Sequence, residues 1–184
     1  MPTRKPAAHR SSARSRRKSP PRSTLRPSPR AVAARYATGH DEKVREALAP
    51  FGRLELYQPQ RIIVLERSAG VTAATVNGTL EELRRHGAVE FITPVLLDVA
   101  SKTRQVLTDE IVLRLKPGRT KRTLDALSAA HGVTIARRNE FEPSQYVVKV
   151  PSPSGMQTLD IARSLDESDD VEFASPNFLT EIKR

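Results

Sequence analysis

The feature that most constrains the fold is a repeated change of hydrophobic period across residues 109–184. Apolar residues alternate in a strand-like run that begins at Glu110, and a stretch with helical spacing follows. Two more strand-like runs, a second helical stretch and a final run that reaches Phe173 complete the segment. Because a period near two indicates a strand and one near 3.6 a helix, the pattern predicts strand, helix, strand, strand, helix, strand.

Turn residues and helix caps set the expected bounds of these elements. The strands are expected at 110–116, 133–138, 144–150 and 171–174, and the helices at 120–131 and 156–167. This order is that of the ferredoxin-like split βαβ fold, an α+β fold with an antiparallel four-stranded sheet and two helices on one face. The other face of such a sheet needs either a polar surface or a partner.

Residues 36–104 resemble a weaker copy of the same unit. Residues 87–98 align with 169–180, since both contain Val-Glu-Phe, a proline three residues later and then a leucine. We therefore interpret the chain as a duplicated unit. The expected helices are 41–49 and 76–86, and the expected strands are 54–57, 61–65 and 88–92.

The first copy is expected to be degenerate, because residues 32–36 are a poor candidate for its opening strand. A polar connector at 100–105 marks the boundary between the copies. The predicted domains are therefore 36–104, the degenerate first copy, and 105–184, the complete unit.

Residues 1–35 contain 11 Lys and Arg and no acidic residue, so the net charge of +10 belongs to this segment. The rest of the chain carries 20 basic and 21 acidic groups. Arg, Ser, Pro and Ala offer too little apolar surface to offset the entropy cost of ordering, which predicts a disordered tail. Its densest basic cluster, a candidate for weak polyanion binding, is Arg14, Arg16, Arg17 and Lys18. A solvated extension without a specific partner is the alternative.

Several classes of protein are excluded by what the sequence lacks. The absence of cysteine removes disulfides, thiolate catalysis and cysteine metal sites, and the four histidines lack metal-site spacing. No apolar run approaches the roughly 18 residues of a membrane span. The start of the chain also lacks the apolar stretch of about 7–15 residues that a secretory signal requires. We expect no cofactor and no metal, and a cytoplasmic location by default.

Four segments of the second unit match the pattern of one known family. They are Asp-Glu-Ile-Val-Leu-Arg-Leu-Lys-Pro-Gly at 109–118, Leu-Ser-Ala-Ala-His-Gly at 127–132, Tyr-Val-Val-Lys-Val at 146–150 and Val-Glu-Phe-Ala-Ser-Pro-Asn-Phe at 171–178. The unit resembles the N-terminal prodomain of subtilisin-like serine proteases, and most of all the fervidolysin-type prodomain. The resemblance covers 105–184 firmly and 41–104 loosely.

In that family the prodomain assists the folding of the catalytic domain and then inhibits it, although such proteins are usually exported. The resemblance implies that the helix-free sheet face packs on a subtilisin-like protease, with loop acids facing helix N-termini, which favour negative charge. The C-terminal segment would lie extended in the substrate cleft. The implied protease-binding residues are Glu140, Glu142, Pro176, Asn177, Phe178, Leu179, Thr180, Glu181, Ile182, Lys183 and Arg184. Taken without the resemblance, the two loop acids are ordinary solvated side chains.

The chain is not expected to be an enzyme. A subtilisin-like catalytic domain needs Asp, His and Ser in that order together with an oxyanion-hole donor. The sequence contains no Asp-x-Gly, His-Gly-Thr or Gly-Thr-Ser segment. The chain is thus expected to be a stand-alone inhibitor, a split gene product or the truncated precursor of a secreted subtilisin-like peptidase.

Two other function classes stay open. A nucleic-acid-binding protein would use the basic tail and a pair of exposed aromatic residues on the central strands, but those strands offer only Tyr146. A small-ligand regulatory domain would need a glycine-rich loop or a polar cluster between the two copies, and the sequence indicates neither.

Overall fold

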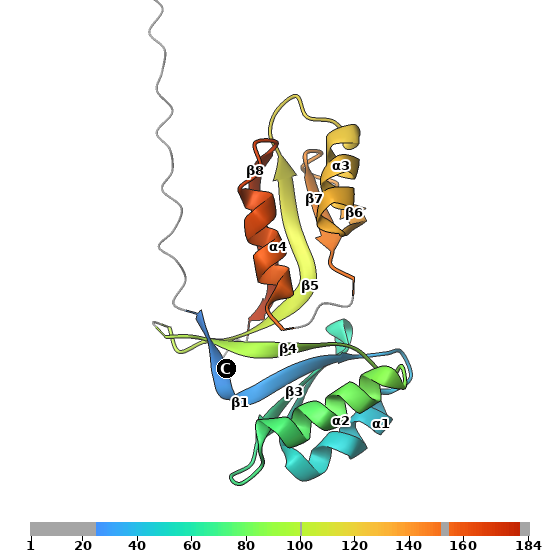
Figure 1. Cartoon of the computed structure of the whole chain (residues 1–184), viewed down its shortest axis with the longest axis vertical. Coiled ribbons are helices and arrows are strands. Elements are labelled where there is room, and N and C mark those ends of the chain that lie inside the picture. The colour runs from blue at the N-terminus through green and yellow to red at the C-terminus, as the bar shows by residue number, and fades with distance from the viewer. Residues whose placement is uncertain (1–24, 100, 152–154, 181–184) are drawn as a thin grey trace, which may run out of the picture.

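The computed structural model describes residues 25–99, 101–151 and 155–180, which form one α+β body with four helices (Figure 1). Its eight strands belong to a single antiparallel sheet with the order β2-β3-β1-β4-β5-β7-β6, and β8 pairs with β5. All strand pairs are antiparallel. The α+β class and the antiparallel sheet are therefore as predicted, whereas one continuous sheet of eight strands was not foreseen.

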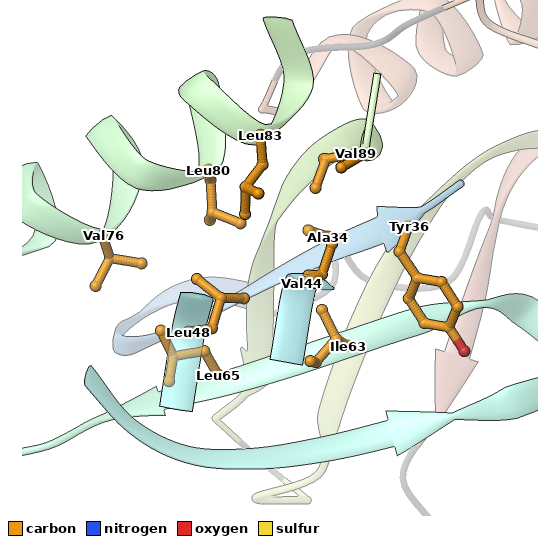
Figure 2. Close-up of a cluster of buried hydrophobic side chains, with 11 residues drawn as sticks. Ala34, Tyr36, Val44, Leu48, Ile63, Leu65, Val76, Leu80, Leu83 and Val89 are labelled. Atoms are coloured by element: carbon orange, nitrogen blue, oxygen red, sulfur yellow. The ribbon is translucent and has the colours of Figure 1, made fainter. Parts of the chain in front are cut away.

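The first half of the chain forms one end of this sheet. Its elements are β1 (Leu25–Tyr36), α1 (Asp41–Leu48), β2 (Gly52–Tyr57), β3 (Ile62–Arg67), α2 (Ala73–Arg85) and β4 (Val89–Asp98), with short 3-10 turns at Ala49–Phe51 and Gln58–Gln60. Apolar residues at helical spacing point Val76, Leu80 and Leu83 of α2 toward the sheet (Figure 2). There they join Val44 and Leu48 of α1 in one buried cluster.

The second half repeats this order of elements. They are β5 (Arg104–Leu115), α3 (Lys121–His131), β6 (Thr134–Arg138), β7 (Gln145–Lys149), α4 (Gln157–Asp166) and β8 (Val171–Thr180). Leu124 of α3 and Leu165 of α4 are fully buried in a cluster with Ile111 and Leu113 of β5 and Val148 of β7. Both helices thus cover one face of the sheet, as the sequence predicted (Figure 1).

Strand β1 corrects the predicted tail. Residues 25–35 were expected to belong to a disordered segment, but they lie in a strand that pairs with β3 and with β4. Ala33, Ala34 and Tyr36 are buried, so a strand rich in alanine is central to the sheet. Composition missed it because small side chains look weakly hydrophobic even where close packing buries them completely. The basic cluster at 14–18 lies outside the described residues.

Strand β8 corrects the predicted end of the last strand. It continues past residue 174 to Thr180, with Pro176 opposite Ile111 and residues 178–180 paired with 105–107 of β5. Proline is tolerated here because β8 pairs on one side only within the described residues and Pro176 lies beside the register shift between Leu107 and Ile111. Residues 177–180, expected to form a free extended segment, are therefore part of the sheet, and 181–184 lie outside the described residues.

A hairpin joins the two halves where the sequence suggested a linker. Val95 of β4 pairs with Val106 of β5, so the sheet continues across the predicted boundary. Val106 and Leu179 then cover the helix-free face of the first half of the sheet, in one cluster with Phe91 and Ile62. This explains why four consecutive residues of β3 are buried, since helices cover one face and the β5–β8 pair covers the other.

A polar junction lies at the irregularity in β5 between Leu107 and Ile111. Asp109 is 2% exposed, and its carboxylate lies 2.6 Å from Nη1 of Arg35 and 3.1 Å from Nζ of Lys149. The Arg35 guanidinium also stacks over the Phe91 ring, 4.8 Å from its centroid. Buried charges of this kind are tolerated only when paired, so the contact ties β1 of the first half to β5 and β7 of the second.

Glu110, the next residue, ties the end of β8 to the same junction. Its carboxylate accepts hydrogen bonds from Nη1 of Arg137 at 3.1 Å and from Nδ2 of Asn177 at 3.0 Å. Burial of Glu110 acts to raise its pKa, but these two hydrogen bonds and the charges of Arg137 and Arg35 outweigh burial and lower the pKa overall. Thr108 Oγ1 also donates to the Asn177 carbonyl at 2.9 Å, so Asn177 is held at both ends.

The substitution Arg35→Met should remove the buried cation while keeping an unbranched side chain beside Phe91. We expect the free energy of unfolding to fall by about 3–5 kcal/mol, because the Asp109 carboxylate is left buried with Lys149 as its remaining cation. Urea denaturation at neutral pH measures this. Arg45→Met is the matched control, since its ion pair with Glu42 is exposed and should contribute less than about 1 kcal/mol. Equal losses at the two positions would contradict the prediction.

The Glu110→Gln substitution should weaken the acid sensitivity of the fold. A carboxylate whose pKa is lowered by folding stabilises the protein above its unfolded pKa, and this contribution is lost as the pH falls through the folded value. The wild type should therefore lose more stability than the variant between about pH 6 and about pH 3.5 in urea titrations. Glu46→Gln, at an exposed position of α1, should follow the wild-type curve. Parallel curves for wild type and Glu110→Gln would refute the assignment.

Candidate protein-binding surface

The candidate site is the helix-free face of the second half of the sheet. Ile111 and Val148 are paired and point into the helix-side core, so their neighbours along each strand point to the opposite face. The paired residues and their neighbours on β8 define this face. They are Glu110, Val112, Arg114, Gln145, Val147, Lys149, Phe173, Ser175 and Asn177.

This face has an apolar centre with charged groups around it. Val112 and Val147 are directly opposite each other on β5 and β7, and Val147 is buried while Val112 is half-buried. Arg114 stacks on the Phe173 ring at 5.4 Å, and Arg137 pairs with Glu110. A small apolar patch with a polar rim is typical of a protein-binding surface.

Tyr146 does not lie on this face. It packs against the helix-side cluster of the second half, with Arg138 stacked over its ring at 5.9 Å. Strand β6 lies at the edge of the sheet in the described residues, so the central strands of this half are β5 and β7, not the strand expected at 133–138. Neither β5 nor β7 has the exposed aromatic residue that the nucleic-acid hypothesis required.

The loop between β6 and β7, residues 139–144, is fixed by its own hydrogen bonds. Asn139 Oδ1 accepts from the backbone N–H of Phe141 at 2.9 Å, and the Asn139 N–H donates to the Gln145 carbonyl at 2.9 Å. The Gln145 N–H donates to the Glu142 carbonyl, and Arg138 Nε donates to the Pro143 carbonyl. An asparagine that bonds the backbone two residues later is a common way to build such a turn. The loop is thus a defined projection rather than a loose connection.

The two loop acids have different roles, although the sequence treated them alike. Glu142 accepts hydrogen bonds from Oγ and N–H of Ser144, at 2.7 and 3.4 Å, and pairs with Arg114 at 3.2 Å. The two Ser144 hydrogen bonds, assisted by the Arg114 charge, lower the Glu142 pKa. Glu140 is exposed and makes no hydrogen bond or ion pair with the described part of the chain. Glu142 therefore braces the loop, and Glu140 is the acid left available to a partner.

Sequence reasoning missed the residue between these acids. Phe141 is 95% exposed at the tip of the loop. A phenylalanine inside the acidic turn Asn-Glu-Phe-Glu was the available signal, because a short hairpin loop has no core in which to bury an aromatic ring.

The C-terminal residues predicted to bind a protease lie along β8. Pro176, Asn177, Phe178, Leu179 and Thr180 are all paired with β5 or adjacent to its irregularity. The pairing of Thr180 with Gln105 places this end of β8 beside the beginning of β5, whereas Glu142 of the loop contacts Arg114 near the end of β5. The structure therefore separates the two groups of predicted residues along one strand. Glu181, Ile182, Lys183 and Arg184 lie outside the described residues.

Two other kinds of site are absent from the described residues. No cluster of three or more acidic or histidine side chains there is arranged to hold a metal ion. No helix in the same residues has the length and apolar character to span a bilayer.

Comparisons with known proteins found similarity to a protease and to a solved structure. A calcium-dependent protease of Trichormus variabilis (strain ATCC 29413 / PCC 7937) is 26% identical over 104 residues, which are 56% of this chain but 16% of that protein. The crystal structure of the small subunit of acetolactate synthase from Thermotoga maritima covers 84% of this chain and 96% of its own at 11% identity and a TM-score of 0.28. A score of this size supports no conclusion about function or ancestry.

The family comparison concerns the second half. The family model of the fervidolysin N-terminal prodomain matches residues 97–177, which contain the helix-free face and the β6–β7 loop. The resemblance seen in the sequence is thus confirmed, and residues 97–177 are similar to a fervidolysin-type prodomain.

Proposed function

We propose that this chain is a propeptide-type binding module that assists the folding of a subtilisin-like serine protease and inhibits it. The observation that carries the proposal is the match of residues 97–177 to the fervidolysin N-terminal prodomain. The similarity to a protease also supports the proposal. It extends over 104 residues, which are 16% of that protein. The module would act by binding alone, without catalysis of its own.

We further propose that each half is a ferredoxin-like split βαβ unit and that the two arose by duplication. The strand orders β2-β3-β1-β4 and β6-β7-β5-β8 are equivalent, and each half has two helices in equivalent places. Val-Glu-Phe begins the last strand of both units, at 89–91 and 171–173. A duplicated unit that cannot bury both of its faces alone gains stability by packing on its copy.

The helix-free face would bind the protease through its apolar centre. Val112 and Val147 can pack on the apolar side of a partner element, and charged groups such as Lys149 can form the rim. The exposed carboxylate of Glu140 can approach a helix N-terminus, where free backbone N–H groups favour an anion. The sheet beneath is already folded, so little entropy would be lost on binding.

The C-terminal segment would reach the substrate cleft from the end of β8. Because residues 177–180 are paired with β5, they would act as a fixed stem, with 181–184 as the part that enters the cleft. Extended peptides bind such clefts by adding main-chain hydrogen bonds. This changes the expectation from the sequence, in which the extended segment began at Asn177.

Inhibition is the direct test of this function. The full chain should inhibit the mature Trichormus variabilis protease, or another member of a panel of subtilisin-like proteases, at sub-micromolar concentration in a chromogenic peptide assay. A panel left fully active at micromolar concentrations of folded protein would exclude inhibition as the function.

Two truncations should separate inhibition from folding. Removal of 181–184 should weaken inhibition by about tenfold or more while changing the unfolding free energy by less than about 0.5 kcal/mol. Removal of 178–184 should also destabilise the fold by about 2 kcal/mol or more, because Leu179 leaves the cluster with Phe91. Inhibition constants and urea midpoints measure both effects. Unchanged inhibition after loss of 181–184 would contradict the role of this segment.

A further inference from the structure

We propose that Phe141 anchors the chain to its partner by inserting its ring into an apolar depression of the protease catalytic domain. The inference rests on the proposed function and deepens it, because it names the residue that supplies most of the binding energy. It also assigns different roles to the three residues at the loop tip.

The side chain of Phe141 is almost fully exposed to solvent. Phe141 is 95% exposed, whereas the next most exposed large apolar side chain in the described residues, Val99, is 50% exposed. One exposed apolar residue is not unusual by itself. An aromatic ring that buries almost nothing within its own chain, however, has its whole apolar surface available to a partner.

The loop that carries Phe141 is preorganised for binding. The backbone of the tip is fixed by Asn139, whose side chain accepts from Phe141 N–H at 2.9 Å, and by the bonds of Glu142 to Ser144. Arg114 then joins Glu142 to the sheet, so the tip is attached to the rigid β5 strand. A ring on a fixed backbone loses little entropy on binding, which is typical of residues that dominate the energy of an interface.

A surface hollow lies beside the ring. It has a volume of about 320 Å³ and is lined by residues 139–141 of the loop and by the sheet residues Val112 and Val147. Phe141 is thus both 95% exposed and part of the lining of this hollow, so a projection and a depression are adjacent. The complementary partner surface has a ridge that enters the hollow and a depression that receives the ring.

The charges around the ring are unequally engaged. Glu142 is occupied by Ser144 and Arg114. The Arg138 guanidinium donates to the Pro143 carbonyl and stacks on Tyr146. Among the described residues, Glu140 therefore supplies the unpartnered carboxylate beside the ring. The partner depression should therefore have one positively polarised group at its edge, such as a helix N-terminus or a cationic side chain. This differs from the pattern implied by the sequence, in which both acids face the partner.

The experiment uses the full chain, the variants Phe141→Ala and Glu140→Gln, and the mature Trichormus variabilis protease as the probe. Loss of a fully buried phenyl ring should raise the inhibition constant about 10- to 150-fold, chiefly through faster dissociation. Glu140→Gln should raise it less, and the effect should shrink at high salt. The matched control is Val99→Ala, which trims another exposed apolar residue far from the loop in sequence and should change the constant less than about twofold.

The outcomes separate this inference from the proposed function. If the wild type inhibits and Phe141→Ala inhibits equally well, or if Val99→Ala causes an equal loss, the anchor is refuted and the proposed function stands. If the wild-type chain neither binds nor inhibits this protease or any other member of the panel, both are overturned. Thermal unfolding of Phe141→Ala should match the wild type, because the exposed ring contributes almost no packing.

Discussion

The buried contact between Arg35 and Asp109 determines how the two halves are joined. Asp109 lies where β5 is irregular, and its carboxylate is compensated by cations from β1 and β7. An unpaired charge at this depth would cost several kcal/mol, so the two halves are held in the arrangement that keeps both cations in place. Phe91, on which the Arg35 guanidinium stacks, belongs to the apolar cluster that contains Val106 and Leu179, so the contact adjoins the packing between the halves.

Strand β5 transmits this arrangement to the proposed binding surface. At its beginning it pairs with residues 178–180, and near its end Arg114 holds the β6–β7 loop through Glu142. The two regions implied as protease-binding are therefore mounted on one strand whose middle is fixed by the ion pair. The first half, which lies outside most of the matched prodomain segment, supports the C-terminal stem instead of acting as a loose appendage.

Within the loop, the proposed binding function divides among neighbouring residues. Glu142 is consumed by internal bonds, which fixes the tip, and Glu140 remains available as a charge. Phe141 presents almost its whole apolar surface to the solvent, where a partner can reach it. This division follows from geometry, since residues adjacent in a tight turn point in different directions and meet different surroundings.

The sequence by itself determined the second half: its order of strands and helices, its α+β class and its resemblance to a prodomain, because hydrophobic period and turn residues are local signals. It also named Glu140 and Glu142 as candidate binding residues, which stays a prediction. Only the tertiary structure revealed that alanine-rich β1 is a central strand, that β8 continues through Pro176 to Thr180, and that the pairing of β4 with β5 continues the sheet across the predicted boundary. These features depend on which surfaces meet across long separations in sequence. For the same reason, the different environments of the two loop acids, set by Ser144 and distant Arg114, were not visible in the sequence.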